Sequence, residues 1–122
     1  MSHTSCSVLV VDDDDELRDT VTELLRLEGF DVSSASNGHE ALEFLRSNPA
    51  PHVIVLDLMM PVMNGQQFRQ AQLDAPAFAA IPVVLLTAVH NGRQQAEAMG
   101  VSDFFSKPVD FDVFIAALRT YC

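Results

Sequence analysis

The stretch VLVVDDDDELR, residues 8–18, passes from four apolar residues directly into four aspartates. A short apolar run followed by helical spacing is typical of a buried strand that leads into a helix. Neighbouring like charges a few ångströms apart repel by about 1 kcal/mol in water, and by several times more where solvent is partly excluded. Four consecutive aspartates therefore need compensation, and what supplies it bears directly on function.

The length and composition are those of one globular domain. The chain has 122 residues, of which 48% are hydrophobic and 20% are charged. This length suits one core, so we expect residues 1–122 to form a single domain. The apolar runs are too short to span a bilayer, and no basic-then-apolar segment at the N-terminus indicates export. We expect a cytoplasmic protein without membrane insertion.

The charge balance bears on partners. Seven basic residues against seventeen acidic ones give a formal net charge of −10. Affinity for nucleic acid comes mainly from Lys and Arg that displace counterions from phosphates, so we expect no direct nucleic acid partner. The acidity fits either solubility or a site built for cations.

The two cysteines, Cys6 and Cys122, lie near the two ends of the chain. They show neither a metal-binding nor a redox spacing. We expect free thiols in a reducing cytosol rather than a terminal disulfide.

Strand-like and helical patterns alternate along the chain. Three of the five predicted strands are nearly all apolar, which suits strands covered by helices on both faces of a sheet. The predicted strands are Val8–Val11, Asp31–Ala35, His52–Leu56, Val83–Thr87 and Phe104–Ser106. Helical spacing, ended by Gly or Pro signals, predicts helices over about 17–28, 41–45, 65–72, 93–99 and 111–121.

Five strand-then-helix repeats imply an α/β fold, a doubly wound parallel sheet with helices on both faces and right-handed crossovers. Ligands of such sheets bind outside the carboxyl ends of the strands, near the switch point in strand order. The residues at these ends are Asp12, Asp13, Asp57, Thr87 and Lys107. We expect their three carboxylates, hydroxyl and amine to converge at one edge of the sheet.

The four aspartates fall into two pairs. Asp14 and Asp15 suit the start of a helix, where one caps the first turn and the other interacts favourably with the helix dipole. Asp12 and Asp13 come too early for that and lie at the strand end. With Asp57 they need a cation, and an all-oxygen site of few carboxylates plus waters suits Mg²⁺. The alternative is a solvated acidic turn without a ligand.

Five motifs follow one another along the chain: VLVVDDD, NGHEAL, VIVLDLMMPVMNG, IPVVLLTA and DFFSKP. Together they resemble the receiver domain of two-component response regulators over its entire length. The resemblance implies a flavodoxin-like sheet with five strands in the order 2-1-3-4-5 and five helices. It also implies that Asp57 accepts a phosphoryl group from a phosphohistidine on a sensor histidine kinase or a histidine phosphotransfer protein.

The resemblance assigns roles to the other strand-end residues. It implies a Mg²⁺ site made by Asp12, Asp13, Asp57 and the backbone carbonyl of Met59. Thr87 and Lys107 would contact the phosphoryl oxygens. Phe104 matches the aromatic position that changes rotamer on activation, which would switch the face of the fourth helix, fifth strand and fifth helix for binding a downstream protein.

Two local features of the family can be compared with this sequence. Asn64-Gly65 stands where the family more often has Asp-Gly, and both pairs suit a turn that needs positive φ. The family also carries a cis peptide at the bond that corresponds to Lys107-Pro108, which fits a tight turn.

Three other readings are less consistent with the sequence. Phosphatase-like hydrolases that form an aspartyl phosphate carry a D-x-D pattern, but position 59 is methionine, so the second carboxylic acid is missing. A flavin module is disfavoured by the acidic first loop and the absence of Trp. A degenerate receiver that serves only for interaction is disfavoured because all five site positions are intact. We expect a phosphoacceptor that slowly dephosphorylates itself, and no turnover enzyme.

The last predicted helix ends almost at Cys122, so we expect no DNA-binding output domain in this chain. Two possibilities stay open at this point: a stand-alone regulator that acts by protein contact, or a domain of a longer chain.

Overall fold

Strands and helices alternate through residues 6–122, the part of the chain that this computed structural model describes. The strands are Ser7–Val11 (β1), Asp31–Ala35 (β2), Val53–Leu56 (β3), Val83–Thr87 (β4) and Asp103–Ser106 (β5). The helices are Asp15–Leu27 (α1), Gly38–Ser47 (α2), Gly65–Asp74 (α3), Gly92–Met99 (α4) and Phe111–Arg119 (α5). Each predicted element is present, and its bounds differ from the prediction by at most three residues. Among the described residues, no helix has the length and apolar character needed to cross a membrane.

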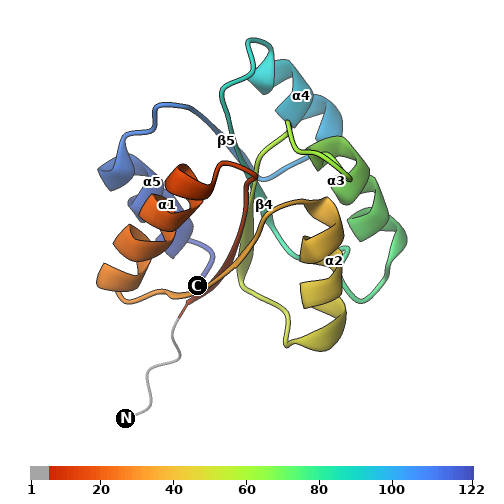
Figure 1. Cartoon of the computed structure of the whole chain (residues 1–122), viewed down its shortest axis with the longest axis horizontal. Helices are drawn as coiled ribbons and strands as arrows, with labels where there is room; N and C mark the ends of the chain where they lie inside the picture. Colours follow the sequence, from red (N-terminus) through yellow and green to blue (C-terminus); the bar gives the residue numbers. More distant parts are fainter. Residues whose placement is uncertain (1–5) are drawn as a thin grey trace.

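The strands form one parallel sheet in the order β2-β1-β3-β4-β5, which confirms the predicted topology. Figure 1 shows α1 and α5 on one side of this sheet and α2, α3 and α4 on the other. The switch point in strand order lies between β1 and β3, because β2 is added on one side of β1, and β3, β4 and β5 are added on the other. The carboxyl ends of these two strands carry Asp12 and Asp57, so both lie at the position where parallel sheets bind ligands.

The sheet separates two hydrophobic clusters, because successive strand residues point to opposite faces. One cluster lies against α2, α3 and α4 and includes Leu9, Ile54, Leu56, Phe68 and Leu85. The other lies against α1 and α5 and includes Val8, Val10, Val55, Leu25 and Phe114. Each side chain of this kind contributes about 1.5–3 kcal/mol when fully buried. The two clusters hold the strand ends, and thus the site, in a fixed arrangement.

The prediction of free cysteines is wrong, because Cys6 and Cys122 form a disulfide whose Cα atoms lie 5.1 Å apart. Strand β1 starts at the edge of the sheet where all parallel strands begin. Helix α5 follows the last strand and returns to that same edge, as each crossover helix does. Cys6 and Cys122 therefore meet, although 116 positions separate them in sequence.

Candidate functional site

The first loop confirms the division of the four aspartates. Asp14 is the N-cap of α1, and its Oδ1 accepts a hydrogen bond from the backbone N–H of Leu17 at 3.2 Å. Asp15 occupies the first helical turn and forms an ion pair with Arg18 at 2.6 Å. These two carboxylates are used by the helix itself.

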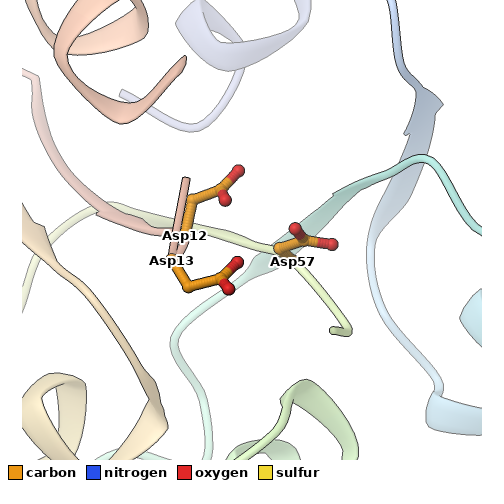
Figure 2. A group of neighbouring side chains, drawn as sticks. All are labelled: Asp12, Asp13 and Asp57. Carbon is orange, nitrogen blue, oxygen red and sulfur yellow. The ribbon is translucent and has the colours of Figure 1, made fainter. Parts of the chain in front are cut away.

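Asp12, Asp13 and Asp57 form a cluster at the carboxyl ends of β1 and β3. One carboxylate oxygen of each lies within 4.8 Å of the others. Asp12 and Asp57 are buried, with 4% and 6% of their surface exposed, whereas Asp13 is exposed. Figure 2 shows the three carboxylates extending to the same side from neighbouring strand ends. The predicted convergence of these residues is confirmed.

Lys107, which follows β5, reaches across to two of these carboxylates. Its Nζ donates to Oδ2 of Asp12 at 2.8 Å and to Oδ2 of Asp57 at 3.0 Å. Burial alone would lower the pKa of Lys107, but the hydrogen bonds to the two carboxylates outweigh it, so the pKa lies above its ordinary value. Lys107 therefore remains a cation between Asp12 and Asp57.

Burial raises the pKa of the Asp12 carboxyl, and the charge of Asp57 acts in the same direction. The bonds from Lys107 and from the backbone of Asp14 oppose this rise. One ammonium group does not balance three carboxylates. The remaining negative charge and the all-oxygen ligand set fit a hard divalent cation such as Mg²⁺.

Two backbone donors complete the site. The N–H of Leu58 donates to Oδ1 of Asp57 at 2.7 Å, and the N–H of Asp14 donates to Oδ1 of Asp12 at 3.0 Å. Sequence reasoning missed both, since a main-chain donor leaves no residue-type signal of its own. Each buried carboxylate therefore has one oxygen held by the backbone and the other held by Lys107.

Thr87 and Phe104 lie side by side near the start of α4. Thr87 ends β4 and is fully buried, and Phe104 in β5 is half-buried. A Cβ added to Gly92 would lie 2.5 Å from Cε1 of Phe104 and 3.1 Å from Cγ2 of Thr87, so a larger residue there would require the Phe104 ring to move. The first residue of α4 is thus packed directly against both side chains.

The loop between β3 and α3 corrects one expectation. Asn64 has φ −79° and caps α3, so the positive φ predicted at Asn64-Gly65 is wrong. Gly65 is needed for another reason, because a Cβ there would lie 2.8 Å from the Cα of Leu58. The left-handed residue is Val62, with φ 67°. Met59, the predicted carbonyl ligand, has 67% of its surface exposed in this loop.

The peptide bond between Lys107 and Pro108, in the β5–α5 loop, is cis as expected.

Comparison with known proteins shows the family of the chain. Residues 8–119 match the response regulator receiver domain family. The chain is 37% identical over 116 residues to the response regulator Rre1 of Synechocystis, covering 93% of this chain and 50% of Rre1. It is 36% identical to PleD of Caulobacter vibrioides, covering 95% of this chain and 26% of PleD. The chain thus spans half of one relative and about a quarter of the other.

Solved structures show the same architecture. The chemotaxis response regulator CheY4 of Vibrio cholerae superimposes with a TM-score of 0.85 at 29% identity, covering 98% of this chain and 100% of CheY4. The response regulator TrrA of Thermotoga maritima, solved in complex with Mg²⁺-BeF, superimposes with a TM-score of 0.84 at 26% identity, covering 95% of this chain and 98% of TrrA.

The fold and the acidic edge of the sheet define a phosphoacceptor module of two-component signalling. The chain belongs to the response regulator receiver domain family. Phosphoryl transfer with Mg²⁺ is general in this family, and its members interact with histidine kinases and downstream targets.

Proposed function

We propose that Asp57 accepts a phosphoryl group from the phosphohistidine of a sensor histidine kinase or a histidine phosphotransfer protein. The observation that carries this proposal is the cluster of Asp12, Asp13 and Asp57 bridged by Lys107. Of the three carboxylates, Asp57 is the one at the end of the central strand β3 and in contact with the lysine. The test is Mg²⁺-dependent addition of one phosphoryl group from acetyl phosphate, measured by intact mass.

Asp12, Asp13, Asp57 and the carbonyl oxygen of Met59 would hold the Mg²⁺. When bound, the ion offsets the repulsion between these carboxylates and the incoming phosphoryl group. The TrrA structure, which was solved with Mg²⁺-BeF, supports this assignment by similarity. A hard cation and oxygen ligands are matched in chemistry.

In the transfer, a carboxylate oxygen of Asp57 bonds to phosphorus while the bond from phosphorus to the imidazole nitrogen breaks. The imidazole keeps the electron pair of that bond. The backbone N–H of Leu58 holds Oδ1 and Lys107 holds Oδ2, so we assign the attack to Oδ2, because the lysine side chain can move its hydrogen bond to the phosphoryl group. Lys107 then moves its hydrogen bond from Oδ2 to a phosphoryl oxygen, and Thr87 supplies a second contact. Positioning and charge stabilisation are the main requirements of such a transfer.

The product would be a phosphorylated protein that loses its phosphoryl group slowly by itself. A second carboxylic acid at position 59, which could serve as proton donor for turnover, is replaced by methionine. We therefore assign a phosphoacceptor role and no substrate turnover.

The partner that delivers the phosphoryl group would dock beside Lys107. A hollow of about 450 Å³ lies there between α1 and the β5–α5 loop. Its lining is mainly apolar and includes Leu17, Leu86, Ala88, Pro108, Val109 and Phe111. We assign it to an apolar face of the histidine-bearing helix, because Lys107 lines the hollow and also contacts the acidic cluster.

The protein would act in the cytoplasm, without membrane insertion and without direct contact to nucleic acid.

The metal site leads to a matched pair of variants. Mg²⁺ binds only the folded state and should stabilise it by about 2.7 kcal/mol at a concentration 100-fold above Kd. Asp13→Asn should remove most of this gain, because Asp13 belongs to the cluster. Asp15→Asn makes the same chemical change next to the cluster and should leave the gain intact, since Asp15 pairs with Arg18. Thermal unfolding with and without Mg²⁺ measures both, and equal losses would mean that the site is misassigned.

The output side of the proposal concerns Thr87 and Phe104. Phosphorylation adds charge at Asp57, and a bistable element must convert it into a change of surface. Thr87 would shift toward the phosphoryl oxygens, and Phe104 would turn into the vacated space. Because Gly92 packs on both side chains, this movement would reach α4 and remodel the face formed by α4, β5 and α5 for a downstream protein.

Thr87→Ala should separate phosphorylation from this response. The variant retains Asp57, Lys107 and the metal ligands, so it should still take up a phosphoryl group, while the response within residues 91–121, at the N-terminal half of α4 and in β5 and α5, is lost. Amide chemical shifts of the phosphorylated wild type and variant measure this. Thr20→Ala, at an exposed position of α1, is the control and should behave as wild type. An unchanged response of residues 91–121 in Thr87→Ala would rule out this route.

A further inference from the structure

Helix α4 is held to the body of the protein by few groups. Only Gly92 and Ala96 of this helix are buried, and both have little or no side chain. Within the described residues, its N-cap Asn91 makes no side-chain capping bond. Low burial and an uncapped N-terminal end are features of elements that move at little cost. The two ends of α4 differ, however, in what they contact.

The C-terminal end of α4 is tied to α3 by Arg69. Its Nε donates to the carbonyl oxygen of Met99 at 3.1 Å, and one terminal nitrogen donates to that of Gly100 at 3.0 Å. The last carbonyl groups of a helix lack partners within the helix and carry its partial negative charge. A planar guanidinium satisfies two of them at once. Figure 1 shows α3 and α4 on the same side of the sheet.

Arg69 is itself fixed by a buried glutamine. Its other terminal nitrogen donates to Oε1 of Gln72 at 2.9 Å. Gln72 is fully buried, and its Nε2 donates to the carbonyl oxygens of Phe78 and Ile81 at 3.0 and 2.9 Å. A buried amide with its hydrogen bonds satisfied is costly to displace. The guanidinium is therefore anchored to α3 and to the α3–β4 loop, away from the acidic cluster.

The N-terminal end of α4 contacts Thr87 and Phe104, the residues proposed above to respond to phosphorylation. Gly92 packs against Thr87 and Phe104, and the guanidinium of Arg93 lies over the Phe104 ring at 5.6 Å from its centroid. A movement of Thr87 and Phe104 thus acts directly on this end. Arg69 makes its contacts at the other end of the helix, with the carbonyl oxygens of Met99 and Gly100.

We propose that Arg69 is a positioning residue that acts as the pivot of α4. It keeps the C-terminal end in place in both states, so phosphorylation of Asp57 displaces the N-terminal half and turns the helix about the Arg69 contacts. This inference rests on the proposed phosphoacceptor function, and it assigns to Arg69 the choice of which part of α4 moves on phosphorylation.

The experiment follows amide chemical shifts when Mg²⁺ and beryllofluoride, a phosphoryl mimic, are added to the full chain. In the wild type, residues 91–96 should shift, and residues 97–101 should move no more than residues of α2. Arg69→Met removes the donors but keeps the apolar stem, and the shifts should then extend through residues 97–101. Arg46→Met, at an exposed ion pair on α2, is the control and should retain the wild-type contrast.

A purely structural Arg69 would lower the melting temperature of Arg69→Met without changing this pattern, and that result overturns the pivot. Wild-type residues 97–101 that shift together with 91–96 overturn it as well. Arg69→Lys keeps the charge but can make fewer hydrogen bonds, so the chemical shift changes should extend only partly into residues 97–101. This variant provides the test if Arg69→Met does not fold. If Mg²⁺ and beryllofluoride shift no residue around Asp57, it is the proposed function that fails, and this outcome is distinct from the other two.

Discussion

Asp57→Asn should abolish the Mg²⁺-dependent uptake of a phosphoryl group from acetyl phosphate. The amide of asparagine is not a comparable nucleophile, so the loss should be complete rather than partial. The variant should still fold, because the replacement has the same shape and its oxygen can accept the hydrogen bond from Leu58. Lys107 also keeps its bond to Asp12. Intact mass after incubation gives the readout.

The control for this prediction is Asp74→Asn, which makes the same substitution at an exposed position at the end of α3. It should gain one phosphoryl group as the wild type does. The same mass increase in Asp57→Asn would show that another residue is the acceptor. A mass increase in the wild type that does not depend on Mg²⁺ would instead argue against the role of the acidic cluster in the reaction.

Much of the site follows from where the strands end. The alternation of strands and helices fixed a parallel sheet, and the carboxyl ends of parallel strands share one edge. This geometry is enough to bring Asp12, Asp57 and Lys107 together, as the hydrogen bonds of Lys107 confirm. Residue types at strand ends are visible in sequence, which is why this part was predictable.

Other features depend on contacts that leave no local pattern. Arg69 and Gln72 show only an ordinary helical spacing, and the partners of Arg69, Met99 and Gly100, lie 30 and 31 positions further on. The left-handed conformation of Val62 could not be predicted either, since a β-branched residue disfavours positive φ. The conformation of Val62 depends on the surrounding β3–α3 loop.

The missed disulfide is a different kind of error, because topology contained the answer. A chain that begins with a strand and ends with its crossover helix starts and finishes at the same edge of the sheet. Cys6 precedes β1, and Cys122 follows α5. The parallel topology that brings the site residues together at the carboxyl ends of the strands therefore brings the two cysteines together at the opposite ends. The prediction of free thiols rested on the cysteine spacing and on a reducing cytosol, and neither takes account of this topology.

Reduction of the Cys6–Cys122 disulfide should lower the free energy of unfolding strongly. The cysteines are separated by 116 positions, and closing a loop of this length restricts the unfolded chain. The chain-entropy relation gives about 5 kcal/mol, while natural disulfides more often contribute roughly 2–4 kcal/mol. A loss in this range should lower the melting temperature by roughly 10–20 °C. Denaturant unfolding of the oxidised and reduced protein measures the difference.

A Cys6→Ser, Cys122→Ser double variant is the control, and its stability should match that of the reduced wild type and not respond to reductant. Equal stability of oxidised and reduced wild type would contradict the prediction. Phosphorylation should survive reduction, because the disulfide lies where β1 begins, whereas Asp12 lies where it ends. Reducing conditions in the cytoplasm favour the dithiol form. In the proposed cytoplasmic location, transfer to Asp57 should therefore not require the disulfide that the structure contains.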